Sequence, residues 1–271
     1  MHHEDGGLKQ DLAIFARMLE RRRALKLFGA AAGFAALGGI GKLLTPVAAA
    51  AGDHCVADAP ETAGPYPADG TNQSQGPTSD VLTEAGVVRR DIRSSFIGSV
   101  AKAKGVPVKL TMQVVNTHGG CAILPGYAVY IWQCDRDAGY SLYTVPKESY
   151  LRGVQVADEN GNLTFKTIFP ACYPGRYPHM HLEIFESLEQ ATNGHNAVLT
   201  TQLALPGDVC QDVYDNAPGY RASRTSFANI SIETDSVFRD DTKRQLRAMT
   251  PKFEGSIKDG YTATCTLGVP V

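Results

Sequence analysis

Alternating apolar and polar residues, rich in β-branched and aromatic side chains, recur along the chain beyond residue 107. Turn signals separate these runs, which is typical of β-strands. The pair Asn160-Gly161 stands between two of them and is a strong hairpin signal. Helical periodicity is nearly absent, with one candidate helix within 240–249 and a turn near 206–214. The expected strands span residues 108–116, 126–135, 162–170, 179–186, 198–206 and 262–271.

This pattern predicts an all-β fold, a β-sandwich core with long functional loops. Residues 71–105 are polar and weakly patterned, so we expect an ordered arm or loop before the core. The chain has 271 residues, 43% of them hydrophobic, which is enough for one substantial core. A formal net charge of −2 gives no electrostatic case for binding nucleic acid or an anionic membrane.

The N-terminal segment has the layout of an export signal. Arg21, Arg22 and Arg23 precede a Gly- and Ala-rich apolar stretch that Lys42 interrupts and that ends in small residues at 48–51. Paired arginines before a mild apolar region resemble a twin-arginine signal. We therefore predict a cleaved signal over 1–50 and an exported domain over 51–271, in the periplasm or outside the cell. The alternative is a retained amphipathic segment or membrane anchor.

The cysteines fit an exported protein. All six lie beyond the predicted signal, and an even number is compatible with up to three disulfides among 15 pairings. No spacing typical of a structural zinc site is present. The cysteines are Cys55, Cys121, Cys134, Cys172, Cys210 and Cys265.

The segment 169–184 gathers several side chains that can bind a metal. His179 and His181 alternate on an expected strand and therefore share one face. By itself, an H-x-H pair is also compatible with a copper or zinc site, or with two hydrogen-bonded histidines. Tyrosines upstream favour a harder ion, because a phenolate oxygen stabilises a ferric ion and a bound cation can keep it deprotonated.

The order of motifs resembles the intradiol ring-cleavage dioxygenases, the family of protocatechuate 3,4-dioxygenase and catechol 1,2-dioxygenase. "IWQCDRDAGY" matches the family's Trp-Gln strand end and ligand tyrosine, here Tyr140. "TIFPACYPGRYPHMH" matches its T-I-x-P-x-x-Y-P and R-x-x-H-x-H segments. The resemblance implies Fe(III) held by Tyr140, Tyr173, His179 and His181, with Tyr173 opposite His181.

Two further segments extend the resemblance over residues 55–206. "ETAGPYP" places Tyr66 in the pocket-lining position, and "LTTQLALP" supplies Gln202. Strand alternation extended backwards from the histidines also places Tyr177 at the pocket. The short spacing from Tyr173 to Arg176 is similar to a compact, exported bacterial branch of the family. Residues 52–107 lack the helical dimerisation segment of catechol 1,2-dioxygenases, so the oligomeric state stays open.

The resemblance implies cleavage of a catechol-type ring between its two hydroxyl-bearing carbons. The partners would be a small-molecule catechol and O2, and the product a cis,cis-muconate. Tyr173 would accept a substrate proton, Arg176 would stabilise negative charge on the substrate, and Gln202 would help to orient Arg176 or the peroxo group. The alternative from another class is a secreted β-sandwich binding module without catalytic iron.

Overall fold

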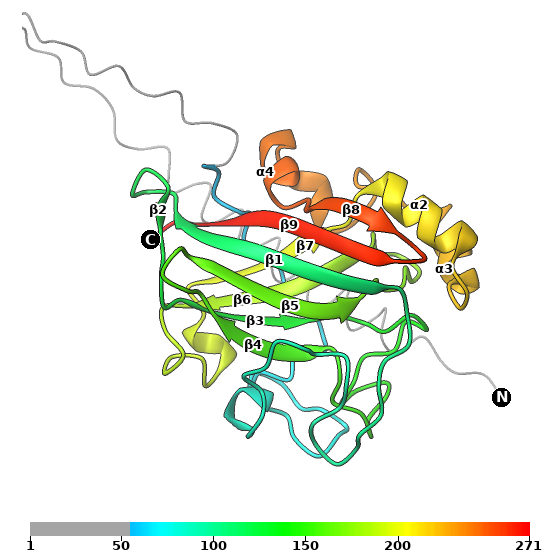
Figure 1. The fold of residues 1–271 in the computed structure, drawn as a ribbon, viewed down its shortest axis with the longest axis horizontal. Helices are drawn as coiled ribbons and strands as arrows, with labels where there is room; N and C mark the ends of the chain where they lie inside the picture. Colours follow the sequence, from blue (N-terminus) through cyan, green and yellow to red (C-terminus); the bar gives the residue numbers. More distant parts are fainter. Residues whose placement is uncertain (1–54) are drawn as a thin grey trace, which may run out of the picture. The chain divides into compact units, whose positions relative to one another are not determined.

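The computed structural model describes residues 55–271, and the predicted export signal over 1–50 lies outside the described residues. In this described part of the chain, nine strands form two sheets, and three α-helices and three short 3-10 helices lie on the connections (Figure 1). Within the described residues, no helix is long and apolar enough to cross a membrane. The strands are β1 (Pro107–Asn116), β2 (Ala122–Ile123), β3 (Ala128–Trp132), β4 (Arg152–Val156), β5 (Asn162–Ile168), β6 (His179–Phe185), β7 (Leu199–Ala204), β8 (Lys252–Ser256) and β9 (Gly260–Val269). The helices are α2 (Gly207–Asn216), α3 (Arg221–Phe227) and α4 (Lys243–Ala248), with 3-10 turns at Val81–Thr83, Gly194–Asn196 and Phe238–Asp240.

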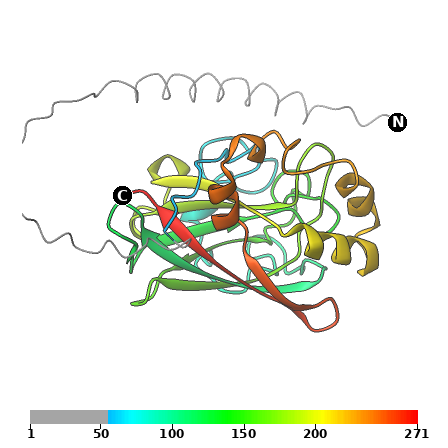
Figure 2. The same ribbon diagram turned by 90° about the horizontal axis from the view of Figure 1, so that it is seen from above.

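The two sheets pack as a sandwich. One sheet has the order β2-β1-β9-β8, with β5 also paired to β1, and the other has the order β4-β3-β6-β7. The turned view in Figure 2 agrees with Figure 1 in placing α2 and α3 at one end of the strands and the C-terminus at the other. The predicted all-β sandwich is confirmed.

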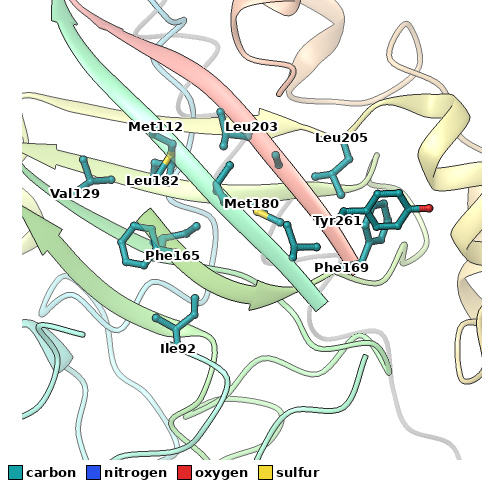
Figure 3. Close-up of a cluster of buried hydrophobic side chains, with 14 of the residues drawn as sticks. Ile92, Met112, Val129, Phe165, Phe169, Met180, Leu182, Leu203, Leu205 and Tyr261 are labelled. Carbon is teal, nitrogen blue, oxygen red and sulfur yellow. The ribbon is translucent and has the colours of Figure 1, made fainter. Parts of the chain in front are cut away.

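The core forms where alternate side chains of the two sheets meet. On β1 the residues Val108, Leu110 and Met112 are buried, whereas Lys109 is exposed and Gln113 is half-buried. From β6, Met180 and Leu182 enter the same cluster (Figure 3). Period-two alternation is the expected result of a strand with one face on a core.

The sheet β4-β3-β6-β7 is covered on its other face as well. All seven residues of β6 and all five of β3 are buried. The loops before β1 and after β3 cover this outer face with a second cluster, which contains Trp132, Tyr140 and Leu142. The polar arm over 71–105 is therefore ordered, as predicted, and it helps to enclose the face of β6 that carries the two histidines.

Several local predictions were wrong. Asn160-Gly161 does form a turn, with the Gly161 N–H donating to the Asp158 carbonyl at 2.8 Å. The strands on its two sides, however, belong to different sheets, because β4 pairs with β3 and β5 pairs with β1. The turn therefore carries the chain from one sheet to the other and makes no hairpin.

The helices were only partly predicted. The segment near 206–214, expected as a turn, forms α2, whose buried Cys210, Val213 and Tyr214 follow helical spacing. The helix expected within 240–249 is present as α4, and Thr242 and Gln245 form a capping box at its start. Helix α3 has a single buried residue, Ser223, so the sequence carries no apolar stripe that could have revealed it.

One disulfide forms in the described chain where up to three were expected. Cys55 and Cys121 are joined, and they lie 66 residues apart in sequence. The other four cysteines are free. Cys172 and Cys210 belong to the main hydrophobic cluster and Cys134 to the second, so they serve as small apolar core residues.

Candidate active site

Strand β6 presents His179 and His181 on the face opposite the sandwich core. Both imidazoles are buried, and the alternating Met180 and Leu182 point into the core. The neighbouring strands add residues in register, since His181 pairs with Trp132 on β3 and with Gln202 on β7. The rings of Trp132 and His181 stack with centroids 4.8 Å apart and an interplanar angle of 6°.

The segment before residue 71, which contains Gly64, packs against His181. Gly64 has a φ of +70°, and a Cβ at this position would lie 3.3 Å from the His181 Cε1. Glycine adopts this φ without the steric cost that other residues bear. The backbone at Gly64 can therefore lie directly against the histidine ring.

The two candidate ligand tyrosines come from loops. Tyr140 lies in the turn after β3, where its N–H donates to the Thr144 hydroxyl at 2.8 Å. The Asp135 carboxylate accepts from the Gly139 N–H at 2.8 Å and fixes the same turn. Tyr173 lies in the loop between β5 and β6, and its carbonyl accepts from the Arg176 N–H at 3.3 Å.

The four predicted ligands bring their donor atoms together. The Tyr140 Oη lies 3.2 Å from the Tyr173 Oη, 3.5 Å from the His179 Nε2 and 3.3 Å from the His181 Nε2. The His179 Nε2 lies 3.1 Å from the Tyr173 Oη and 3.1 Å from the His181 Nε2. Ligands about 2.0–2.1 Å from a first-row metal ion stand roughly 3 Å apart, so these separations suit a shared ion.

The surroundings of both histidines favour the neutral imidazole, which has a lone pair that can bind a metal ion. The His179 Nδ1–H donates to the Tyr177 carbonyl at 2.6 Å, which leaves the Nε2 lone pair directed at the other donors. Burial lowers the pKa of His179 well below its usual value, and the nearby Arg176 lowers it further. Burial likewise lowers the pKa of His181, with contributions from His179 and Arg176. Both imidazoles are therefore neutral.

The tyrosines need a cation in order to ionise. Burial raises the pKa of Tyr140 well above 10, and the neighbouring Tyr173 raises it further. A metal ion supplies the positive charge that offsets this cost. No group of three or more His, Cys, Asp or Glu gathers for a metal anywhere in residues 55–271.

Arg176 and Gln202 also meet here. The Arg176 Nη2 donates to the Gln202 Oε1 at 2.7 Å, and the Gln202 Nε2 donates to the Thr62 carbonyl at 2.8 Å. The Arg176 Nη1 lies 3.5 Å from the His179 Nε2. The guanidinium therefore borders the donor cluster without being one of its ligands.

The two predicted pocket tyrosines, Tyr66 and Tyr177, lie in different surroundings. The Tyr66 ring lies 5.0 Å from the Tyr140 ring and 5.1 Å from the Tyr143 ring, next to the donor cluster. The Tyr177 ring instead packs against Phe227 and Phe238, at 5.8 and 6.4 Å. The expectation that Tyr177 lines the pocket is therefore corrected. Alternation does not extend back to Tyr177, because β6 begins only at His179.

Two charged residues of the site were missed from the sequence. Arg152 is fully buried and donates to the carbonyls of Tyr66, Pro67 and Ser141, which ties the Tyr66 segment to the turn of Tyr140. Asp235 is fully buried and pairs with Arg176 at 3.0 Å. A single arginine in a strand and a single aspartate in a polar loop match no motif, so the sequence alone does not mark them as site residues.

Comparison with known proteins shows what this chain is similar to. Residues 94–218 match the model of a dioxygenase family. The fold is that of the solved intradiol dioxygenases. The solved intradiol ring-cleavage dioxygenase from Tetranychus urticae is 24% identical, with a TM-score of 0.57, over 80% of this chain and 96% of that one. The dioxygenase domain of a carbohydrate-binding fusion protein from Streptomyces sp. SirexAA-E is 21% identical, with a TM-score of 0.48, over 80% of this chain and 99% of that one. A search of curated proteins found no match.

The family match confirms the resemblance seen in the motifs, and the likeness to the Tetranychus enzyme shows the intradiol dioxygenase fold. The family match and the fold support ring cleavage of catechol-type compounds as the general activity. The matched region contains all four converging donors and Arg176, but it ends before Asp235.

Proposed function

We propose that the chain is a non-haem Fe(III) dioxygenase. It cleaves a catechol-type ring between the two hydroxyl-bearing carbons and incorporates O2 to give a cis,cis-muconate-type product. The observation that carries this proposal is the convergence of two phenol oxygens and two neutral imidazole nitrogens, with the Tyr140 Oη and the His179 Nε2 each 3.1–3.5 Å from the other three donors. Two oxygen and two nitrogen donors of this kind suit a hard trivalent ion.

Tyr140, Tyr173, His179 and His181 would hold the ion. Ferric iron bound there supplies Lewis acidity, which favours the dianion of a catechol and makes its ring reactive toward O2. The hydrogen bond from His179 Nδ1 to the Tyr177 carbonyl fixes the ring orientation, and the stack on Trp132 fixes His181. Burial of both histidines excludes water from this side of the site.

Tyr173 is the proposed base for substrate binding. Its ring is half-buried, whereas that of Tyr140 is almost fully buried, so the Tyr173 phenol faces the more accessible side. We assign the Tyr173 Oη as the atom that accepts a proton from an incoming catechol. Tyr66, beside Tyr140, would line the pocket against which the ring packs.

Arg176 is the proposed electrostatic stabiliser. Its Nη1 points at the donor cluster, and its Nη2 is held by Gln202. A buried cation with a fixed orientation stabilises negative charge on the substrate strongly, because little solvent screens it. Gln202 orients Arg176 and is itself anchored on the Thr62 carbonyl.

A panel of catechols tests this function. Iron-loaded protein should consume O2 and form a muconate absorbance band with at least one of catechol, protocatechuate and hydroxyquinol. Protein with the double substitution Tyr140→Phe/Tyr173→Phe, which lacks both phenol donors, should do neither. Iron-loaded parent protein that binds catechols without O2 uptake would favour the alternative, a secreted binding module of the same fold.

We also propose that residues 1–50 form a twin-arginine export signal and that residues 51–271 act in the periplasm or outside the cell. The disulfide between Cys55 and Cys121 supports an oxidising compartment, since such bonds are rare in reducing ones. Arg22 and Arg23 at the start of the apolar stretch support the twin-arginine route.

A further inference from the structure

The guanidinium of Arg176 is fixed at two of its three nitrogens. The Nε donates to the Asp235 Oδ2 at 3.0 Å, and the Nη2 donates to the Gln202 Oε1 at 2.7 Å. The third nitrogen, Nη1, lies 3.5 Å from the His179 Nε2. Because a guanidinium is planar and rigid, two fixed nitrogens determine where the third one points.

Asp235 is the acidic member of this arrangement and is completely buried. Its Oδ2 also accepts from the Tyr177 N–H at 2.6 Å, and its Oδ1 accepts from the N–H groups of Val237 and Phe238 at 2.8 and 3.0 Å. Both carboxylate oxygens are thus held by the backbone. The carboxylate is a fixed counter-ion, whereas a surface aspartate could follow the movements of its partner.

Arg176 requires a counter-ion because it is only 7% exposed, and Asp235 supplies it. A buried guanidinium without a counter-ion is costly, and removing one partner of a buried pair is strongly destabilising. The Phe238 ring, 6.0 Å from the Arg176 Cζ, packs on the same group. The loop before α4 therefore supplies both the charge and the apolar wall against which Arg176 rests.

We propose that Asp235 is a positioning residue of the reaction: it holds Arg176 so that the Nη1 edge faces the bound substrate. This inference rests on the proposed function, and it assigns to residues after the family-matched region a part in the site. Asp235 touches no candidate ligand side chain in the described structure and acts only through Arg176 and the Tyr177 backbone.

The key variant is Asp235→Asn, which is isosteric. Its amide oxygen can still accept from Val237 and Phe238, whereas its NH2 group would face the N–H donors of Arg176 and Tyr177. The charge and the pairing are lost, but the shape of the loop is kept. With iron-loaded protein we expect kcat to fall about 10- to 100-fold, with KM and iron content within about twofold of the parent. Asp235→Glu, which keeps the charge, should lie nearer the parent.

A double-mutant cycle separates positioning from a merely structural role. In an Arg176→Ala background, Asp235→Asn should cause no further loss of kcat, because its effect passes through Arg176. Asp215→Asn is the matched control, since it breaks the exposed pair of Asp215 and Arg224, whose atoms lie 2.8 Å apart. That control should leave kcat unchanged. Additive losses in the double variant, or parental kcat in Asp235→Asn, would overturn the proposal.

The same cycle measured by urea unfolding gives a readout that does not need activity. The double variant should lose less stability than the sum of the two single variants. A parent chain that loads iron and cleaves no catechol would contradict the proposed function alone. The unfolding cycle would then still decide whether Asp235 holds Arg176, and additive losses there would overturn the pairing.

Discussion

Tyr173 and Arg176 lie three residues apart in one loop, yet they contact different partners. The Tyr173 Oη lies among the donor atoms, 3.1 Å from the His179 Nε2, whereas the Arg176 guanidinium rests on Gln202 and Asp235. The first contact is the one expected of the proposed ligand and base. The second is that of a cation fixed beside the ligands, so substitution at the two positions should have different consequences.

We predict that Tyr173→Phe shifts the visible spectrum and lowers turnover, because a phenolate donor and the proton acceptor are both lost. Arg176→Ala should keep iron and resting colour but lose about 10²–10³ in kcat, the usual cost of one preorganised electrostatic group. Iron content, visible spectra and steady-state kinetics measure both effects. Loss of iron in Arg176→Ala together with parental turnover in Tyr173→Phe would reverse the two assignments.

Asp58 is a second buried carboxyl, and it has no proposed role in the active site. Its side chain is almost completely buried. Burial raises its pKa from 3.8 to about 8, against a smaller lowering by the Gly268 backbone. The folded-state pKa thus lies above the unfolded one. Asp58 therefore lowers the free energy of unfolding as pH rises from about 4 to 8, and it has no such effect below that window.

Asp58→Asn should accordingly stabilise the protein at pH 8 by at least about 2 kcal/mol, because the folded state no longer has to keep a proton on a buried acid. At pH 4 the parent and the variant should differ little. Urea unfolding at both pH values measures this difference. An equal gain at both values would show that ionisation of Asp58 is not its cause.

At the scale of elements, β6 connects sequence pattern with chemistry. The apolar alternation of Met180 and Leu182 predicted the strand and its core face. His179 and His181, which alternate with these residues, were correctly expected on one face. The order of the motifs predicted that Tyr140 and Tyr173 lie close to them, as the structure has it.

Other features were beyond the reach of sequence patterns. Tyr177 was placed wrongly because Pro178 stands between it and the first residue of β6, so strand alternation does not apply there. The turn at Asn160-Gly161 was recognised, but its change of sheet depends on pairing with β3 and β1, which local sequence does not specify. Arg152 and Asp235 owe their roles to contacts with segments many residues away.

The disulfide at the end of β1 offers a test at this scale. Cys55 and Cys121 tie the start of the described arm to the turn after β1 and close a loop of 66 residues. We predict that Cys55→Ser/Cys121→Ser lowers the free energy of unfolding by about 2–4 kcal/mol, chiefly by freeing the unfolded chain. The difference between oxidised parent and variant in urea should disappear when the parent is reduced. A difference that persists after reduction would assign the loss to the serine substitutions themselves.

At the scale of the whole molecule, the site is assembled from most of the described chain. Gly64 and Tyr66 come from the arm before the sandwich, the donors from loops and β6, and Asp235 from the loop before α4. The family-matched region 94–218 therefore contains the ligands but not the complete site. A truncated chain limited to that region would lack both the cover of His181 and the counter-ion of Arg176.

The export proposal is also a property of the whole chain. Changing Arg22 and Arg23 together to Lys should leave precursor in the cytoplasm of a bacterial host that has the twin-arginine route, because that route reads the arginine pair. Arg17→Lys, a matched change outside the pair, should export normally. Cell fractionation and N-terminal sequencing of the exported form provide the measurement. Undiminished export of the paired variant would point to the general secretory route.

The most direct test of the central claim is the metal content and visible spectrum of the purified protein. Two tyrosines and two histidines, of which Tyr140 and His179 each lie 3.1–3.5 Å from the other three donor atoms, should hold ferric iron. We predict about one iron per chain and a wine-red colour from tyrosinate-to-Fe(III) charge transfer, lost in Tyr140→Phe/Tyr173→Phe. Stoichiometric zinc or copper, without iron and without a charge-transfer band, would contradict it.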